Sequence, residues 1–498
     1  MQIEHRLRLR PELASRAILS SAYRTPPVRG EDRVHLSEFL ESRFLRTSFS
    51  PAQRTPGLTT KEVRLMSSRP AKQFHDRHFP VRPNLDQLKH QAKDLLRAIR
   101  QGDPAAVAEL RKHHPAKNAK PIAPATAKLA NAQAALARSY GLPNWPRLVT
   151  ACRMTDAIWR GDVDTVRQLV LKNPQLLHES ARGIADSNWG PPMSYAANVG
   201  QDAIIAMLRE MGAKDLQHAF DRACLQGQLE TARRLHAMGA CVVPGLALGP
   251  CETLNADGLA FLLELGAELA DKDGDRLAPV ALLLQTYCRG PKQKHRCLEL
   301  VAKRGIALPD TPVMALHRGR IDLLEAHLRR DPQLLARTFS HEDIYPPALG
   351  CSTDHSFGLH GTPLAGTTLL HICVDFDEIE IARWLIEQGA NVNAKAEIDA
   401  DGFGGHTPLF GCVVSQAYLC GRQQDAEFAR VLLDHGADPN AHASLRKRLR
   451  FVADDSIHEY RDVTPLSWGE RFHGPGYPGH TWVSQPAMKL IAERGGRP

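Results

Sequence analysis

The chain has 498 residues, of which 43% are hydrophobic, 24% charged and 6% aromatic, close to average globular usage. The formal net charge is +8, but residues 1–80 hold 15 Lys or Arg against 8 Asp or Glu, which leaves only +1 for residues 81–498. Charge alone therefore gives no case for nucleic-acid binding. No apolar run approaches the roughly 20 residues that a membrane helix needs, so we expect no membrane association.

Residues 1–80 mix Arg, Pro and Ser with little periodicity, a composition that buries too little apolar area to offset the entropy of ordering. We predict a disordered basic tail over residues 1–80. Met66 begins MSSRPAKQF shortly before a helical pattern starts, so one hypothesis is that Met66 is the natural start. The alternative is a genuine basic tail. The first apolar stretch, from Leu13, is broken by Arg16, which argues against a secretory signal.

One phrase recurs from Asn84 onward. It reads AIRQGDPAAVAELRKHHP from Ala98, AIWRGDVDTVRQLVLKNPQLL from Ala157 and ALHRGRIDLLEAHLRRDPQLL from Ala315. The phrase is typical of a helical hairpin. A short helix is followed by a turn at the glycine, and a second helix with one apolar face then ends at the proline. Because one such pair cannot bury its own apolar face, the copies must stack, which predicts a helical solenoid.

A second version of the unit is more specific. It runs GTTLLHICVDFDEIEIARWLIEQGANVNA from Gly366 and GHTPLFGCVV from Gly405. These segments resemble the ankyrin repeat, whose signature is G-x-TPLH-x-A-A with Gly-Ala 21 residues after the Thr. Thr368 and Gly389 keep that spacing. The resemblance implies that the Thr caps the first helix and that the His bonds across to neighbouring backbone.

The resemblance covers roughly residues 85–498, and it predicts an all-α ankyrin-repeat solenoid of stacked helix-turn-helix units with finger loops. The chain departs from the ankyrin signature at four positions: Leu369 replaces Pro, Phe410 and Ser467 replace His, and Asp377 takes the inter-helix Gly position. We expect a helical leader or N-terminal cap at 84–150, degenerate repeats at 151–335, a long inter-repeat loop at 336–365, and repeats with insertions and a C-terminal cap at 366–498. A similar leader precedes the repeats of some bacterial ankyrin proteins, which favours a bacterial origin.

Three stretches are longer than a repeat of about 33 residues allows. The loop 336–365 holds Cys351, His355 and His360 at spacings that a soft metal uses, although the same side chains can simply satisfy the backbone of an ordered loop. A second insertion lies around SQAYLCGRQQD, and the connection before it carries Asp399 and Asp401, which we interpret as solvated turn residues.

The third stretch, residues 441–480, contains the basic cluster Arg446, Lys447, Arg448 and Arg450. Such a cluster can grip phosphate or an acidic partner. Acids follow it directly at Asp454, Asp455, Glu459 and Asp462, so we expect internal pairing.

The ten cysteines lie between Cys152 and Cys420 without a Cys-x-x-Cys pair, as buried residues of a reducing compartment would, and we expect a cytoplasmic protein. The chain lacks a Gly-rich phosphate loop, a nucleophile elbow, an HExxH helix and a kinase motif set. We therefore expect no enzyme, no cofactor and no bound metal.

The sequence predicts a monomeric binding module that takes a protein partner along its concave face and long loops. The candidate contact residues lie in the loops: His341, His355, His360, Arg446, Arg448 and His473. The alternative is a small-ligand or metal-dependent site built from the His-, Asp- and Cys-rich loops, which requires the Cys351–His360 loop and the His473/His480 loop to converge. A third hypothesis, a secreted effector acting in a host, has no distinguishing mark in the sequence.

Overall fold

A computed structural model describes residues 77, 79–113, 122–185, 187–354, 361–420, 425–448, 457–472 and 483–498. The hypothesis of a start at Met66 and most of the predicted disordered tail concern residues outside this part of the chain. At its end the prediction of a tail to residue 80 is wrong, because Phe79 is buried against Tyr140 and Arg77 pairs with Glu109 at 2.9 Å. None of the helices in the described residues combines the length and the apolarity that crossing a bilayer requires.

The leader is a bundle of helices whose first member is amphipathic. Asn84 caps α4 because its side chain accepts hydrogen bonds from the backbone amides of Asp86 and Gln87. One face of α4 is buried, and the opposite face carries its charges. The bundle comprises α4 (Leu85–Arg100), α5 (Pro104–His113), the short 3-10 turn η2 (Pro124–Thr126) and α6 (Leu129–Ser139).

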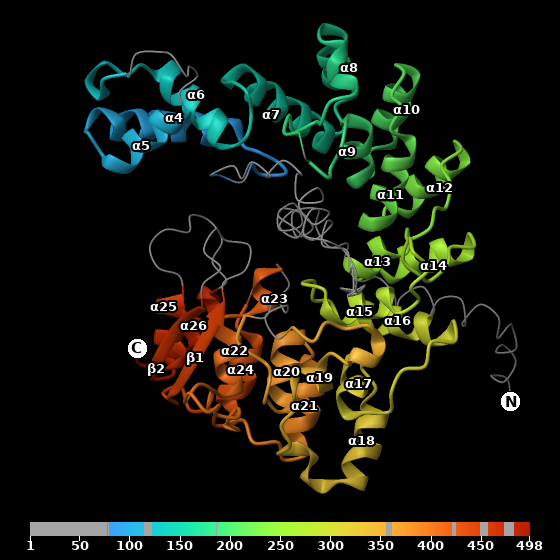
Figure 1. Cartoon of the computed structure of the whole chain (residues 1–498), viewed down its shortest axis with the longest axis vertical. Helices are drawn as coiled ribbons and strands as arrows, with labels where there is room; N and C mark the ends of the chain where they lie inside the picture. Colours follow the sequence, from blue (N-terminus) through green and yellow to red (C-terminus); the bar gives the residue numbers. More distant parts are fainter. Residues whose placement is uncertain are drawn as a thin grey trace, which may run out of the picture.

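Paired helices follow the leader along the chain, one helix of each pair on the inner side of the stack and one on the outer side (Figure 1). The pairs are α7 (Trp145–Arg160) with α8 (Val163–Lys172), α9 (Pro192–Asn198) with α10 (Asp202–Glu210), α11 (Leu216–Gln226) with α12 (Leu229–Ala237), α13 (Leu248–Glu252) with α14 (Ala256–Glu264), α15 (Ala278–Gln285) with α16 (Pro291–Lys303), α17 (Pro312–His317) with α18 (Ile321–Arg330), α20 (Leu369–Phe376) with α21 (Ile379–Glu387), α22 (Pro408–Val413) with α24 (Glu427–Asp434), and α25 (Pro465–Phe472) with α26 (Gln485–Glu493).

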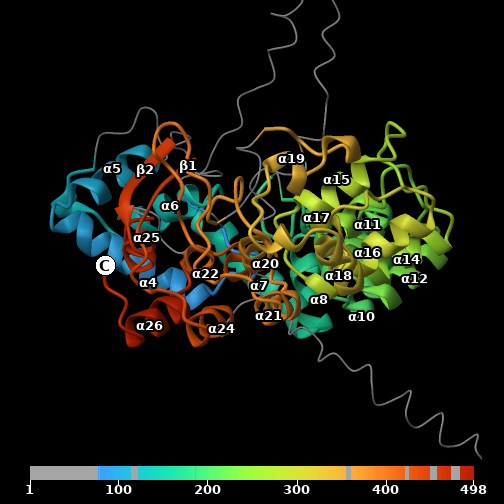
Figure 2. The ribbon, with the colours of Figure 1, turned by 90° about the horizontal axis from the view of Figure 1, so that it is seen from below.

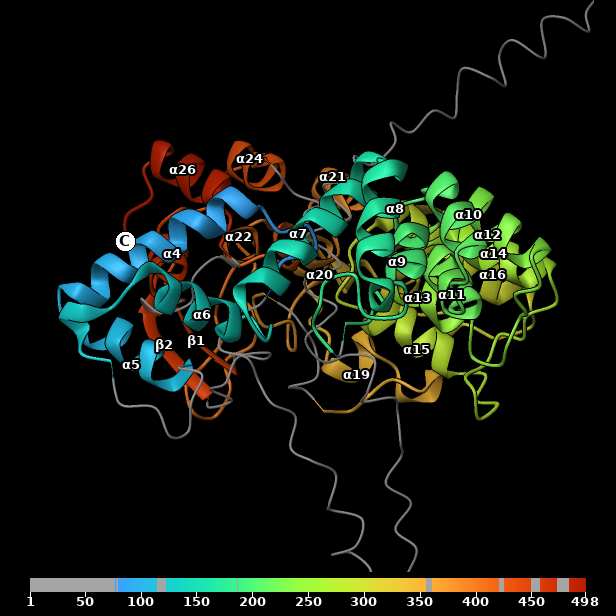
Figure 3. The same cartoon turned by 90° about the horizontal axis from the view of Figure 1, so that it is seen from above.

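The stack curves strongly. In Figure 1 the pairs follow an arc from α7 round to α26, so that the leader lies above the C-terminal pairs. Figure 3, seen from above, shows α4 passing over the region of α22 and α24. Because each pair packs against the next, the buried core is a continuous band along the arc rather than one central core.

Local bonds at α20 explain how one repeat joins the next. Thr368 caps the helix, and its hydroxyl lies 2.9 Å from Nδ1 of His371. Nε2 of the same ring lies 3.0 Å from the carbonyl oxygen of His406, in the next repeat. This is the cross-repeat bond that the sequence resemblance implies. Asp377 ends α20 with φ 63°, a left-handed conformation in which aspartate is tolerated in place of glycine.

Regular pairing is interrupted after α18 and after α22. The first interruption contains η4 (Pro332–Leu335), α19 (His341–Ile344) and η5 (Pro347–Leu349), and the second contains α23 (Gln416–Leu419). The 3-10 turn η3 (Pro174–Leu177) follows α8. These short segments form the ordered parts of the two interruptions between helix pairs.

The expected all-α fold is mostly helical, with one difference. Part of the third insertion forms an antiparallel hairpin of β1 (Ala443–Arg448) and β2 (Ile457–Val463), with an irregularity between Ala443 and Leu445. In Figure 2 the hairpin and α19 lie along one edge of the stack, opposite α24 and α26. The hairpin was missed because four of the residues around β1 are basic, which hides the alternation of Leu445 with its exposed neighbours.

A buried tryptophan ties the end of the long loop to the C-terminal pair. Trp468, fully buried on α25, donates from Nε1 to the hydroxyl of Thr362 at 3.2 Å. The same hydroxyl lies 3.1 Å from the carbonyl oxygens of Phe410 and Val414. One threonine therefore links the loop, α22 and α25.

We predict that Thr362→Val lowers the free energy of unfolding by about 1–3 kcal/mol. It leaves the indole N–H of Trp468 and the carbonyl of Val414 without this partner, and it removes one of the two hydrogen bonds that the carbonyl of Phe410 accepts. The measurement is the urea midpoint followed by fluorescence. Thr150→Val is the matched control: its hydroxyl bonds only the carbonyl of Pro146, four residues earlier on an exposed helix face. Equal midpoints for the two variants would contradict the role given to Thr362.

Candidate functional site

The described part of the loop after α18, residues 336–354, is held against the stack through His341 and Ser352. His341 is buried on α19, and Nε2 of its ring lies 3.0 Å from the carbonyl oxygen of Ser352. The side-chain amide of Gln285 on α15 bonds both backbone groups of Ser352. Its NH₂ group donates to the carbonyl oxygen of Ser352, and its oxygen accepts from the amide N–H of Ser352. The expectation that His341 offers a partner contact is therefore corrected, because its imidazole is used inside the protein.

Cys351 is buried in the same loop. Burial raises the pKa of its thiol to about 12, so the sulfur stays protonated and is a poor metal ligand. Within the described residues, no three His, Cys, Asp or Glu side chains are placed to share one metal ion. His355, His360 and His473, and with them the proposed convergence of the two His-rich loops, lie outside the described residues.

The connection between α21 and α22 forms a finger, residues 390–406, that folds back on itself. The backbone amide of Ala396 donates to the carbonyl of His406, and that of Asp399 donates to the carbonyl of Phe403. Gly404 has φ 128°, and a Cβ there would lie 1.9 Å from the carbonyl oxygen of Glu397. Only glycine fits this close approach, which fixes the tip of the finger.

Arg446 of β1 joins the hairpin to the finger. Its guanidinium lies 2.7 Å from a carboxylate oxygen of Asp399 and 2.8 Å from one of Asp401. Backbone bonds between Gly404 and Ser444 run alongside, at 2.6 and 3.2 Å. The amide of Phe403 and other finger amides hold the pKa of the Asp399 carboxyl below its usual range, so that carboxylate is charged near neutral pH.

These contacts correct two sequence-based interpretations. Arg446 pairs within the chain as expected, but its partners are Asp399 and Asp401, not the acids that follow it in sequence. Glu459 lies opposite Arg446 in the hairpin register, and Asp454 and Asp455 are outside the described residues. Asp399 and Asp401 are accordingly anchors for an arginine rather than merely solvated turn residues. Arg448 ends β1, and its side chain is outside the described part of the chain.

We call the unit made of residues 390–406, β1 (443–448) and β2 (457–463) the clasped finger. Two guanidinium groups contact the buried ring of Phe403: the centroid lies 5.1 Å from Cζ of Arg446 and 4.3 Å from Cζ of Arg461. Two large apolar side chains remain on its surface: Ile398 is 66% exposed and Ile457 is 56% exposed. A rigid surface with two exposed isoleucines beside charged groups is suited to contact with another protein.

A second group of polar side chains lies on the inner helices of neighbouring pairs. Arg222 of α11 is buried, and its Nε donates to Oδ1 of Asn198 on α9 at 2.8 Å. Glu252, the last residue of α13, is also buried, and its backbone carbonyl accepts from the hydroxyl of Thr286 at 2.5 Å. Nη2 of Arg222 and Oε1 of Glu252 have no hydrogen-bond partner among the described residues.

The charges of Arg222 and Glu252 influence each other without a direct ion pair. Burial raises the pKa of the Glu252 carboxyl to about 7, and the charge of Arg222 opposes the shift. Burial likewise lowers the pKa of Arg222 to about 10, opposed by Glu252. Nη2 of Arg222 and Oε1 of Glu252 are thus a buried hydrogen-bond donor and a buried acceptor, neither with a partner among the described residues.

A third polar cluster joins α15 and α16 to α20. The guanidinium of Arg289 lies 2.6 Å from a carboxylate oxygen of Asp375 and 4.4 Å from the ring centroid of Phe376. Lys294 lies 3.3 Å from Nδ1 of His317, and Nε2 of that ring lies 3.0 Å from the carbonyl of Ile344. Burial holds the pKa of His317 well below its usual value, so the neutral ring accepts at Nδ1 and donates at Nε2.

Sequence reasoning missed the second and third clusters because their interacting members are separated by 23 to 86 residues and carry no shared motif. Only Asp375, beside the repeat signature, could have drawn attention: an acid at a position inside the apolar pattern LLHICVDF is unusual for a buried helix.

We predict that Glu252 makes stability depend on pH. Its folded-state pKa is raised above the unfolded value, so its contribution is fully present below about pH 4.5 and is lost as pH rises through about 7. Relative to a Glu252→Gln variant, the wild type should lose about 2–3 kcal/mol of unfolding free energy between pH 4.5 and 8. Parallel urea titrations of both proteins measure this, and identical pH profiles would contradict it.

We also predict that Arg446→Ala frees the finger. Amide hydrogen exchange at residues 399–405 should accelerate by roughly fivefold, because the clasp contributes about 1 kcal/mol to closing the finger. Arg494→Ala is the control, since Arg494 pairs with Asp434 at 2.8 Å with a similar exposure. Unchanged exchange in the finger would show that the backbone bonds hold it without Arg446.

Comparison with known proteins identifies one repeat directly. Residues 365–397, which contain α20, α21 and the start of the finger, match the family model described as ankyrin repeat. No curated protein sequence matches the chain.

Among solved structures, the chain is similar to the human ASB11 ankyrin repeat domain, with 16% identity over 62% of this chain and 99% of that chain, at a TM-score of 0.22. This likeness is too weak for a partner to be inferred from it. The matching repeat carries the cap and the cross-repeat bond of Thr368 and His371, and it stands within a continuous stack of helix pairs. The chain is therefore a mostly helical ankyrin-repeat protein.

Proposed function

We propose that the protein is a scaffold that binds a protein partner through the clasped finger and the adjoining concave side of the stack. Ankyrin repeats are in general protein-binding modules, and their extended concave surfaces provide the contact area. The observation that carries the proposal is the exposure of Ile398 on the finger and of Ile457 on the hairpin, two elements that Arg446 ties together.

Physical chemistry favours this surface over the rest of the described exterior. Large exposed apolar side chains that are held rigidly lose little conformational freedom on binding, so more of their burial contributes to affinity. Arg446 pairs with both Asp399 and Asp401, which leaves this group with a net charge of −1 and a lower desolvation cost on binding than three unpaired charges would have.

The wider setting of the proposal follows from the sequence. The described cysteines are free and all but Cys241 are buried, which fits a reducing compartment such as the cytoplasm. We further propose a monomer. A bacterial origin rests only on the likeness of the leader to those of bacterial ankyrin proteins. The matching family is typically non-catalytic, which supports a binding role over an enzymatic one.

A small-ligand site is a second candidate. The observation that favours it is the pair of buried polar atoms without a protein partner, Nη2 of Arg222 and Oε1 of Glu252. If a ligand rather than a protein is the physiological target, Glu252→Gln should abolish its binding and changes on the clasped finger should not.

We predict that replacing both Ile398 and Ile457 with serine abolishes partner capture, since each exposed isoleucine contributes about 1–2 kcal/mol when buried at an interface. The assay is affinity capture from the native cell extract, with quantitative mass spectrometry of the bound proteins. Leu171→Ser is the matched control, because Leu171 is also 66% exposed but lies on the outer helix α8.

The proposal expects a set of proteins that wild type and Leu171→Ser both retain and that the double variant loses. If wild type, Leu171→Ser and the double variant all capture the same proteins, the clasped finger is not part of the binding surface.

A further inference from the structure

The leader carries a charge that the whole-chain total conceals. Residues 81–160, which comprise the leader and α7, hold 14 Lys or Arg and only 5 Asp or Glu, a net charge of +9, whereas residues 161–498 hold 34 and 42, a net charge of −8. The near-neutral sum over residues 81–498 is thus a basic N-terminal part, the leader with α7, joined to an acidic remainder of the stack. Opposite charges on two ends of one molecule give each end its own preference for partners.

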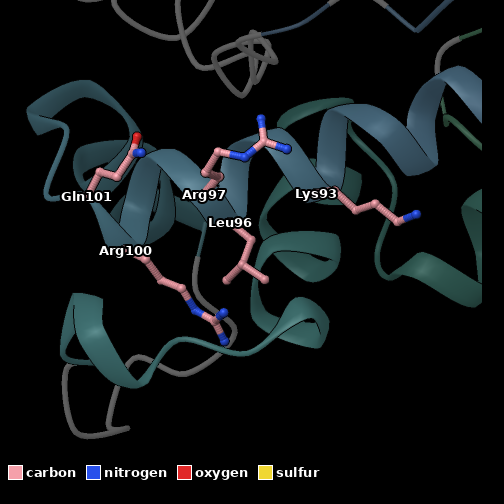
Figure 4. Close-up of a pocket in the computed structure, with 5 residues that line it drawn as sticks. All are labelled: Lys93, Leu96, Arg97, Arg100 and Gln101. Carbon is pink, nitrogen blue, oxygen red and sulfur yellow. The ribbon is translucent and has the colours of Figure 1, made fainter.

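Three of the leader's basic side chains line an open hollow on the exposed face of α4. The hollow measures about 350 Å³ and is lined by Lys93, Leu96, Arg97, Arg100 and Gln101. In Figure 4 the side chain of Leu96 lies between those of Lys93 and Arg100. Because the helix rises 1.5 Å per residue, Lys93 and Arg100 are about 10 Å apart along the axis.

The three cations differ in how far they are already engaged. Lys93 has no acidic partner among the described residues. Arg97 bonds Asp94 at 2.9 Å, but both side chains are about two-thirds exposed, so this pair is weak. Arg100 donates from Nε and Nη2 to the carbonyl of Ala127, which leaves Nη1 to bond another group.

We propose that this hollow docks an acidic segment of a protein partner, with an apolar side chain on Leu96 and carboxylates on Lys93, Arg97 and Arg100. The inference rests on the proposed function as a protein-binding scaffold and adds the chemistry of the partner. Charge complementarity selects an acidic partner. Leu96 selects a peptide over a nucleic acid, because a phosphate backbone makes no use of an apolar contact placed among cations, and no aromatic side chain lines the hollow for a base to stack on.

The test uses the full chain and a defined probe. A fluorescein-labelled 12-residue peptide, Glu-Glu-Leu repeated four times, is titrated with protein and followed by anisotropy at low salt. The comparison probes are the same peptide with Ser in place of Leu and a single-stranded DNA with the same number of negative charges. Binding of the Leu peptide should be the tightest, and it should weaken by roughly tenfold between about 0.05 and 0.5 M salt.

A Lys93→Ala/Arg97→Ala double variant should bind the Leu peptide roughly tenfold more weakly, because two exposed cations of the docking face are lost. The matched control is Lys489→Ala/Arg329→Ala. Arg329 is 67% exposed and pairs with Glu325 at 3.0 Å, as Arg97 is 67% exposed and pairs with Asp94 at 2.9 Å. Leu96→Ser should weaken binding of the Leu peptide several-fold and leave that of the Ser peptide unchanged.

Equal affinities for the two double variants would overturn the proposal, and so would tighter binding of the DNA than of the Leu peptide. Neither result bears on the clasped finger. If the peptide fails to bind but the Ile398/Ile457 variant still loses its captured proteins, only the hollow is wrong. If the peptide binds and the captured proteins persist without the two isoleucines, only the clasped finger is wrong.

Discussion

The buried ion pair between Arg289 and Asp375 holds together the part of the stack where regular pairing fails. Arg289 sits in the short segment between α15 and α16, and its guanidinium bonds both the carboxylate and the backbone carbonyl of Asp375 on α20. It therefore joins two inner helices across the intervening pair α17 and α18. Two charges buried this deeply are stable only as partners, since an unpaired one costs several kcal/mol in desolvation.

The Arg289–Asp375 pair lies where the long loop and the second insertion are anchored to the stack. Gln416 of α23 donates to the carbonyl of Tyr287, two residues before Arg289, and so fixes the second insertion to the same place. Thr362 and Trp468 then secure the end of the long loop, and α22 positions the base of the finger. The clasped finger is accordingly mounted on a rigid base, which is the condition for a loop to bind with little loss of entropy.

Much of the fold could be predicted from sequence because each repeat contains its own local signals. The glycine turn, the Thr cap at Thr368 and the spacing of apolar residues are all read within about 30 residues. The substitution of Asp377 for glycine was visible in the same way, and the residue adopts the left-handed conformation that the position demands.

The binding surfaces were harder to predict because they depend on residues far apart in the chain. Arg446 was singled out by its basic neighbours, but its partners Asp399 and Asp401 are 47 and 45 residues away in sequence. His341 was chosen as a loop residue and proved buried, since hydrophilic residues in a long loop often satisfy its own backbone. The basic N-terminal part can be found from the sequence by counting charges segment by segment. Its net positive charge becomes visible when residues 81–160 are counted apart from residues 161–498.

The most direct test of the binding role is amide hydrogen exchange on the protein with and without a captured partner. A partner held as proposed should slow exchange at the finger, residues 390–406, and at β1 and β2, and leave the outer helices α8, α10 and α12 unchanged. Protection confined to those outer helices, with the finger and hairpin exchanging as in the free protein, would contradict the assignment of the clasped finger as the binding surface.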